Sequence, residues 1–274
     1  MDRAQLTKYL KSRSELLKAL ELMGPHGQLD DGKSKKLKEV AGFSEVILRY
    51  VDEFLGDSDE VRILECSCGK SYLGLVLCIL LQEFLGKTGL LTGVDIDGDL
   101  VEKCRQVARK VGYDDVEYVQ SRTLDFETDE EFDLVVALHA CDTATDEAIA
   151  KGIQIGARLV LCVPCCQNQI RGQIKKDHPL EGITEYGPAR FRLANLLTDT
   201  LRAQFLRSAD YYVQMDEVVS PRVTPKNLCI CARKVKRKGK NRRDIRYLEL
   251  RDMFGVKPAV ERFCPGVVEP PERE

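Results

Sequence analysis

The sequence has no hydrophobic run long enough to cross a membrane. Its apolar stretches, such as Tyr72 to Leu81, are shorter than the roughly 20 residues that a spanning helix needs, and charge soon follows them. The first residues, Met1-Asp2-Arg3, do not resemble a secretory signal. From both absences we expect a protein of the cytoplasm with no membrane partner.

A disulfide framework is also lacking. The chain has 11 cysteines, an odd number, and Cys165 and Cys166 are neighbours. In a reducing compartment such residues stay thiols, so we expect them to pack as small hydrophobic side chains. The content of 43% hydrophobic and 31% charged residues excludes a disordered chain and is typical of a globular protein.

Acidic residues are absent from the stretch Arg233 to Arg243, which is rich in lysine and arginine. A shorter basic cluster spans Lys33 to Lys38. Such segments can bind a polyanion such as a nucleic acid, but they can equally be solvated linkers that keep a protein soluble. The net charge of -2 does not decide between these interpretations.

The spacing of hydrophobic residues along the chain changes near residue 61. Before it, Ala4 to Leu22 and Lys35 to Leu55 have helical spacing, separated by a break at Gly24 to Gly27. After it, short apolar runs alternate with longer amphipathic segments, which indicates βαβ units and a parallel sheet. We expect strands at Val61 to Cys66, Leu90 to Asp95, Val116 to Val119, Phe132 to Leu138, Leu159 to Val163, Tyr211 to Val218 and Leu228 to Ala232. We expect helices at Tyr72 to Phe84, Gly98 to Val111, Asp146 to Ile155, Ala189 to Arg207 and Tyr247 to Phe254.

These elements predict the α/β class and a Rossmann-like, seven-stranded sheet. The last two strands follow each other closely, joined by a loop from Ser220 to Asn227, so the sheet should end in a hairpin. The pattern predicts three parts: an N-terminal helical segment (1–60), the sheet domain (61–234) and a basic, partly helical C-terminal extension (235–274).

The segment Val61 to Val76 reads as a strand, a turn of small residues and an apolar helix. That order places free backbone N–H groups at the carboxyl end of the sheet, where Rossmann-like folds bind nucleotides. A P-loop would need a glycine at the position of Leu64, inside the strand. A dinucleotide fingerprint would need glycines at positions 67, 69 and 72, of which only Gly69 is present.

The remaining template is that of S-adenosylmethionine binding, an acid followed by alternating small residues. Glu65, Ser67, Gly69 and Ser71 have this spacing. The cofactor carries no phosphate, so the turn has to admit an amino-acid moiety and a ribose, and serine can replace glycine where the backbone angles permit. We expect Glu65 to meet the cofactor's ammonium group and Gly69 to pass close to its sulfonium. The neighbours Cys68 and Tyr72 belong to the same expected pocket.

A second cofactor marker closes the next strand, where Asp95 and Ile96 follow an apolar run. A carboxylate at this place can accept both ribose hydroxyls. Asp97 fits better as the N-cap of the following helix. We also expect Thr123, after the third strand, to reach the adenine and Leu138, at the end of the fourth, to line the pocket.

Polar side chains gather after the fourth and fifth strands. His139 and Asp142 follow one strand and could serve as the base that accepts a proton from the methyl acceptor, although His139 could instead only shape the pocket. Cys141, Cys165 and Cys166 lie near them in the expected fold. A metal site with His139, or a nucleophilic cysteine beside it, is conceivable, but no second Cys pair follows at a zinc-module spacing, so we expect no metal.

Two segments carry a resemblance to a known family. Leu138 to Ile149, with the sequence LHACDTATDEAI, and Pro164 to Gln167 resemble a class I methyltransferase domain family of bacteria. Its relatives include eukaryotic methyltransferase-like proteins and tRNA ribose 2′-O-methyltransferases. Leu197 to Arg202 and Thr224 to Leu228 also fit the bacterial group, and the match spans roughly Lys35 to Val260.

The resemblance implies a class I fold, S-adenosylmethionine as cofactor and RNA as substrate. From their charge, the basic clusters Lys33 to Lys38 and Arg233 to Arg243 are the expected contacts of RNA. The sequence departs from the family at two places. Ser67 and Ser71 replace glycines, and Asn168-Gln169 occupies positions where a histidine and an acid are more usual. It also lacks the Cys/His zinc modules of the tRNA enzymes. The expected function is therefore methyl transfer to an oxygen or nitrogen atom, on RNA, or alternatively on a protein or small molecule, or cofactor binding without turnover.

Overall fold

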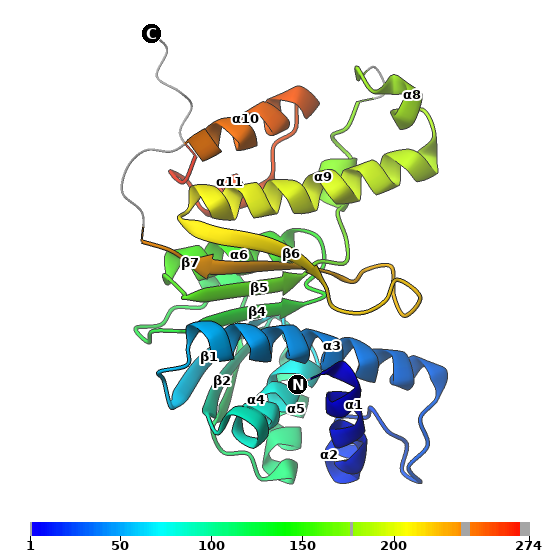
Figure 1. The fold of residues 1–274 in the computed structure, drawn as a ribbon, viewed down its shortest axis with the longest axis vertical. Coiled ribbons are helices and arrows are strands. Elements are labelled where there is room, and N and C mark those ends of the chain that lie inside the picture. The colour runs from blue at the N-terminus through cyan, green and yellow to red at the C-terminus, as the bar shows by residue number, and fades with distance from the viewer. Residues whose placement is uncertain (1, 176–177, 237–241, 269–274) are drawn as a thin grey trace.

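One seven-stranded sheet organises the chain (Figure 1). The computed structural model describes residues 2–175, 178–236 and 242–268. The strands run in the order β3-β2-β1-β4-β5-β7-β6, and β7 is antiparallel to both of its neighbours, β5 and β6, whereas the other pairs are parallel. Their bounds are β1 Glu60–Cys66, β2 Thr88–Asp95, β3 Val116–Gln120, β4 Leu134–Leu138, β5 Leu159–Val163, β6 Tyr211–Glu217 and β7 Leu228–Lys234.

This order confirms the predicted Rossmann-like class I methyltransferase sheet with its terminal hairpin. Strands β1 and β4 are neighbours in the sheet, with β2 and β3 on the far side of β1 and the later strands on the far side of β4. The direction in which successive strands are added to the sheet therefore reverses between β1 and β4. In open α/β sheets, ligands bind in the crevice at the carboxyl ends of the strands beside such a switch point. The fold therefore places the ends of β1, β2, β4 and β5 at the expected site.

Helices cover both faces of the sheet (Figure 1). Within β4, Leu134 and Val136 belong to the hydrophobic cluster of the N-terminal helices, whereas Val135 and Ala137 belong to the cluster on the other face. This alternation follows from the two-residue period of a strand. The first face carries α1 Arg3–Ser12, α2 Ser14–Ala19, α3 Asp31–Phe54, α4 Tyr72–Leu85 and α5 Gly98–Val111. The second carries α6 Thr143–Gln154, α9 Gly187–Ser208, α10 Arg242–Phe254 and α11 Ala259–Phe263.

Helix α4 has apolar side chains on nearly every face, because the sheet and other helices bury nearly all of its surface. It packs against β2 and against the long helix α3, which lies across it. A helix that faced water would need a polar stripe. Helix α3 thus belongs to the same hydrophobic cluster as the sheet, although it precedes the first strand. The three-part division at residues 60 and 234 stays a prediction.

Several helix bounds differ from the sequence-based expectation. The expected helix from Ala4 to Leu22 is two helices, because the chain turns at Arg13, whose φ is -89° and ψ 58°. Helix α6 begins at Thr143 rather than Asp146. The short helices were not predicted, since pieces of this length have no hydrophobic period: a 3-10 turn at Thr123–Asp125, α7 Asn168–Arg171, α8 Glu181–Thr184 and α11. Within the described ranges, no helix is long and apolar enough to span a bilayer.

A buried cluster of charged groups joins the second helical layer to the carboxyl edge of the sheet. Arg202 of α9 is 1% exposed and donates to Asp146 of α6, at 2.7 and 3.1 Å, and to Asp199 at 3.1 Å. It also donates to the backbone carbonyl of Asp142 at 2.7 Å. The carboxylates raise the pKa of Arg202 above its usual range, although burial lowers it. Gln167, after β5, donates to Asp199 at 3.1 Å. This Arg202 cluster fixes the segments that follow β4 and β5.

We predict that Arg202→Ala lowers the free energy of unfolding by about 3–5 kcal/mol, because two buried carboxylates lose their cation. Urea denaturation measures the effect. The control is Lys18→Ala, which removes the cation paired with the exposed Glu15 and should cost less than about 1 kcal/mol. Equal small losses in both variants would contradict the account of the Arg202 cluster.

Candidate functional site

The turn between β1 and α4 has an unusual backbone. Ser67, Gly69 and Ser71 all have positive φ, at 50°, 55° and 46°. Such angles cost a non-glycine residue about 1–2 kcal/mol each. A Cβ at Gly69 would meet no atom within 4 Å, so the space above this residue is open. The turn therefore stores strain while it leaves backbone free to approach a ligand.

Glu65 ends β1 and lies beneath this turn. Its carboxyl group accepts hydrogen bonds from Ser71 Oγ and from the backbone N–H of Gly74. A Cβ at position 74 would clash with that carboxyl group, so Gly74 is required there. Tyr118 donates to Ser71 Oγ at 3.1 Å. Glu65 is 3% exposed, and burial raises its pKa to about 7 although Ser71 and Gly74 oppose the shift.

Asp95, at the end of β2, reaches back to the same turn. Its carboxylate accepts from the backbone N–H of Gly69 at 2.8 Å and from that of Asp97 at 3.0 Å. A carboxylate has about four acceptor positions, so two remain available. Ile96 beside it is 72% exposed, an uncovered apolar side chain at the edge of the site. Asp97 caps α5 by accepting from the backbone N–H groups of Asp99 and Leu100, which confirms the predicted cap.

The other predicted cofactor residues lie at different depths. Cys68 is 8% exposed, and Tyr72 and Leu138 are partly buried at the same edge of the sheet. Lys36 of α3 lies 6.0 Å above the Tyr72 ring. Thr123 is 5% exposed and hydrogen-bonds the buried Cys66 thiol, so its side chain is already engaged within the protein.

His139 contacts Glu39, a residue that was not among the predicted site residues. Its Nε2 lies 3.2 Å from Oε2 of Glu39, which comes from α3. Lys36 lies 3.5 Å from the same oxygen. Burial raises the pKa of Glu39, but the His139 hydrogen bond and the charge of Lys36 outweigh it, so the pKa lies below its usual range. Only the fold brings these residues together, since Glu39 and His139 are 100 positions apart.

Asp142 lies beside His139, and both have positive φ, at 52° and 61°. The Asp142 carboxylate accepts from the backbone N–H of Gln169 at 3.0 Å, which links the loops after β4 and β5. Six non-glycine residues in the described part of the chain have positive φ, and four of them lie at this edge of the sheet. Such outliers cluster at functional sites.

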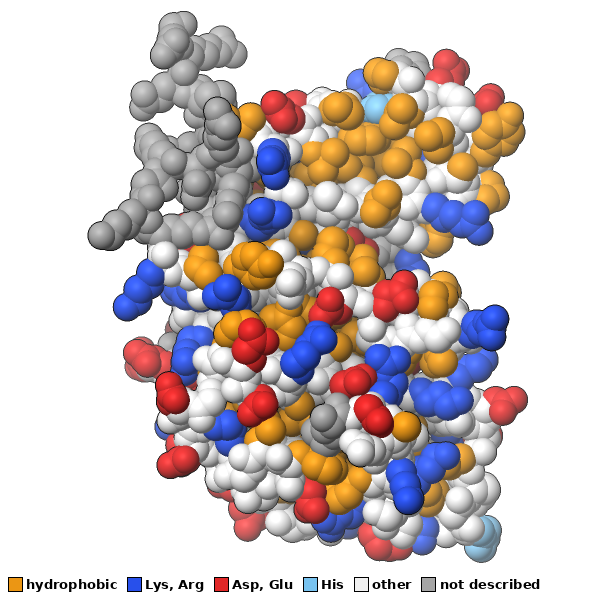
Figure 2. Space-filling view, in the orientation of Figure 1, with side chains coloured by type: hydrophobic (Ala, Val, Ile, Leu, Met, Phe, Trp, Pro, Cys, Tyr) orange, Lys and Arg blue, Asp and Glu red, His pale blue; other side chains and the backbone are white. Residues whose placement is uncertain are grey.

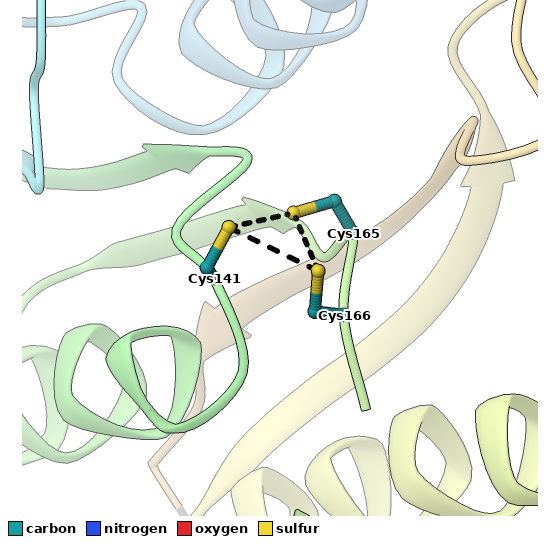
Figure 3. Close-up of side chains that lie close together, drawn as sticks. All are labelled: Cys141, Cys165 and Cys166. Atoms are coloured by element: carbon teal, nitrogen blue, oxygen red, sulfur yellow. Dashed lines mark hydrogen bonds between the residues drawn. The ribbon is translucent and has the colours of Figure 1, made fainter. Parts of the chain in front are cut away.

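Three cysteine side chains meet between the same two loops (Figure 3). Cys141 follows β4, and Cys165 and Cys166 follow β5. Their Sγ atoms lie 3.4, 3.7 and 3.9 Å apart. All 11 cysteines of the chain are free thiols. Burial, together with the neighbouring thiols, raises the pKa of Cys165.

The described parts of the two basic clusters lie at opposite edges of the sheet. Lys33 to Lys38 occupy the first turns of α3, next to Glu39 and thus to the site, where Figure 2 shows several lysine and arginine side chains. Arg233, by contrast, pairs with Leu159 at the start of β5, so it lies at the amino edge. Residues 237–241 of the second cluster fall outside the described residues.

Residues 35–173 match a family described as a methyltransferase domain. This match covers half of the chain and includes both the Asp95 turn and the cysteine loops. The chain belongs to this family. The expected enzyme class, a methyltransferase with S-adenosylmethionine as methyl donor, is thereby confirmed.

Several solved structures are similar at low identity. An rRNA methylase from Streptococcus thermophilus is 11% identical, with 69% of this chain and 97% of that chain covered and a TM-score of 0.44. A putative rRNA-methylase from Clostridium thermocellum is 14% identical, covering 69% and 94%, with a TM-score of 0.46. Magnesium protoporphyrin IX methyltransferase from Synechocystis is 12% identical, covering 86% and 100%, also with a TM-score of 0.46. No curated protein matches the chain.

We predict that Glu65→Gln changes the pH dependence of stability. The folded protein holds the Glu65 proton up to about pH 7, whereas the unfolded chain releases it near pH 4.5. This contribution to stability is therefore complete below pH 4.5 and is lost as the pH rises to 7. Relative to wild type, the variant should gain up to about 3 kcal/mol over this interval.

Urea denaturation at pH 5, 6, 7 and 8 measures the difference. The control, Glu131→Gln, changes an exposed carboxylate and should give a constant difference across the series. A constant difference for Glu65→Gln as well would show that the Glu65 carboxyl group titrates normally.

Proposed function

We propose that this methyltransferase binds S-adenosylmethionine at the ends of β1 and β2 and transfers the methyl group to an oxygen or nitrogen atom of RNA. The observation that carries the proposal is the Asp95 carboxylate, held against the open turn by Gly69 with two acceptor positions left. We place this activity in the cytoplasm, where the cysteines would remain reduced.

The residues at the ends of β1 and β2 fit the cofactor. The free acceptor positions of Asp95 suit two ribose hydroxyls, and the uncovered side chain of Ile96 suits an adenine ring. Glu65 would attract the ammonium group once it has lost its proton, through the turn that contains Ser67 and Gly69. We keep Cys68, Tyr72 and Leu138 as lining residues and give Thr123 only a supporting role. S-adenosylmethionine, when bound, supplies a methyl group activated by its positive sulfur.

The acceptor would meet the ends of β4 and β5. Glu39 orients the His139 ring by accepting a hydrogen bond from Nε2–H, which leaves the lone pair on Nδ1. His139 can then take a proton from the acceptor atom as a general base. Asp142 accepts the Gln169 N–H and so links the loops after β4 and β5, and we assign it to positioning of the loop rather than to proton transfer.

RNA is the substrate class that the charge distribution favours. Lys35 and Lys38 are exposed on α3, four and one positions before Glu39, so a phosphate bound to them would lie near His139. Each lysine that contacts a phosphate releases a counterion and adds to the salt dependence of binding. Arg233 and Lys234, at the opposite edge, would contact more distant parts of a long RNA.

The test is a transfer assay with labelled S-adenosylmethionine on separated RNA, protein and small-molecule pools from cells that lack this protein. We predict label in RNA. The variant Lys35→Glu with Lys38→Glu should weaken RNA binding and lower its salt slope by about one for each lost contact.

The control reverses the same number of charges at the amino edge, Lys234→Glu with Lys236→Glu, and should have the smaller effect on transfer. Label that enters only protein or small molecules would contradict the RNA assignment. Label in no pool, despite cofactor binding, would favour a module without turnover.

A further inference from the structure

We propose that the loops after β4 and β5 form a metal site in which Cys141, Cys165 and Cys166 bind one Zn²⁺ ion through three thiolates. This goes beyond the proposed methyl transfer and does not depend on it. It also revises the expectation of no metal. The sequence offered four candidate ligands, and the fold brings the three thiols together while the His139 ring contacts Glu39.

The spacing of the three sulfur atoms suits a tetrahedral metal. Zn²⁺ binds thiolate sulfur at about 2.3 Å, which places two such sulfur atoms about 3.8 Å apart. The three Sγ distances are 3.4, 3.7 and 3.9 Å. The three atoms therefore already lie close to one face of the tetrahedron that the ion requires (Figure 3).

The ligands are held in place by their surroundings. The Arg202 cluster anchors the segment after Cys141 through the Asp142 carbonyl, and the segment after Cys166 through Gln167 and Asp199. A site that is fixed before binding avoids much of the cost of ordering its ligands. Cys141 is exposed, so an ion can reach the sulfur atoms from solvent.

Three protein ligands leave the fourth position of the ion open. Among the described residues no other histidine, cysteine or acid groups with the three thiols. Structural zinc sites are closed by four protein ligands, whereas catalytic sites keep one position for water or substrate. The site lies between His139 and the β5 loop, on the acceptor side of the edge, so this position would be open to a substrate atom or water.

Binding is coupled to proton release. The three thiols lose three protons as three Zn–S bonds form, and the complex of Zn²⁺ with three thiolates carries one negative charge. Affinity should therefore rise with pH.

The test measures Zn²⁺ affinity of the full chain in a phosphine reductant, by competition with a chromophoric zinc indicator and without any methyl acceptor. We expect one ion per chain, with proton release recorded by a pH dye in weak buffer. Cys141→Ser removes an exposed ligand that the core does not need, and it should weaken binding at least about tenfold. Co²⁺ should give a sulfur-to-metal absorption band that this variant reduces.

The matched control is Cys264→Ser, which removes a buried thiol that follows α11 in the second helical layer and should leave the affinity unchanged. Circular dichroism confirms that each variant is folded. Wild-type affinity no higher than that of Cys141→Ser, or equal losses in Cys141→Ser and Cys264→Ser, would overturn the site, since either result would mean adventitious binding to thiols.

Discussion

The position of the loops after β4 and β5 depends on one constraint, the buried Arg202 side chain. It contacts Asp146, Asp199 and the backbone carbonyl of Asp142. It joins α9 to α6 inside the second helical layer, and it reaches the loop after β4. Gln167 extends the same cluster to the loop after β5. A buried ionic cluster adds little net stability over an apolar core, but a broken one is costly. Its effect here is geometric, because it fixes the two loops that carry His139 and the cysteines.

The ends of β1 and β2 are held by a different set of contacts. Asp95 and Glu65 accept backbone N–H groups from the β1 turn, so two acids at adjacent strand ends fix one strained segment. The positive φ angles at Ser67, Ser71, His139 and Asp142 lie on both sides of the edge. The surrounding hydrogen bonds compensate for this strain. The carboxyl edge of the sheet is therefore held in place before any ligand binds, and Glu39 of α3 contacts His139 at this edge.

Most of the fold could be predicted from the sequence, because β-strand alternation and helix periods are local. All seven strands were found, and so was the Asp97 cap, which lies within a few residues of a strand end. Glu39 was missed because its partner His139 is distant in sequence and α3 reads as a plain amphipathic helix. The cysteine group could be suspected but not placed. Its geometry depends on the Arg202 cluster, whose members come from three separate segments.

The central claim is that the site at the ends of β1 and β2 binds S-adenosylmethionine through Asp95. Isothermal calorimetry tests it most directly, with wild type, Asp95→Ala and the control Asp97→Ser, which keeps a helix-capping oxygen. The account predicts binding to wild type and to the control, and a loss of about 1–3 kcal/mol for Asp95→Ala, from the lost hydrogen bonds. No binding heat with wild type, or equal affinity of wild type and Asp95→Ala, would contradict it.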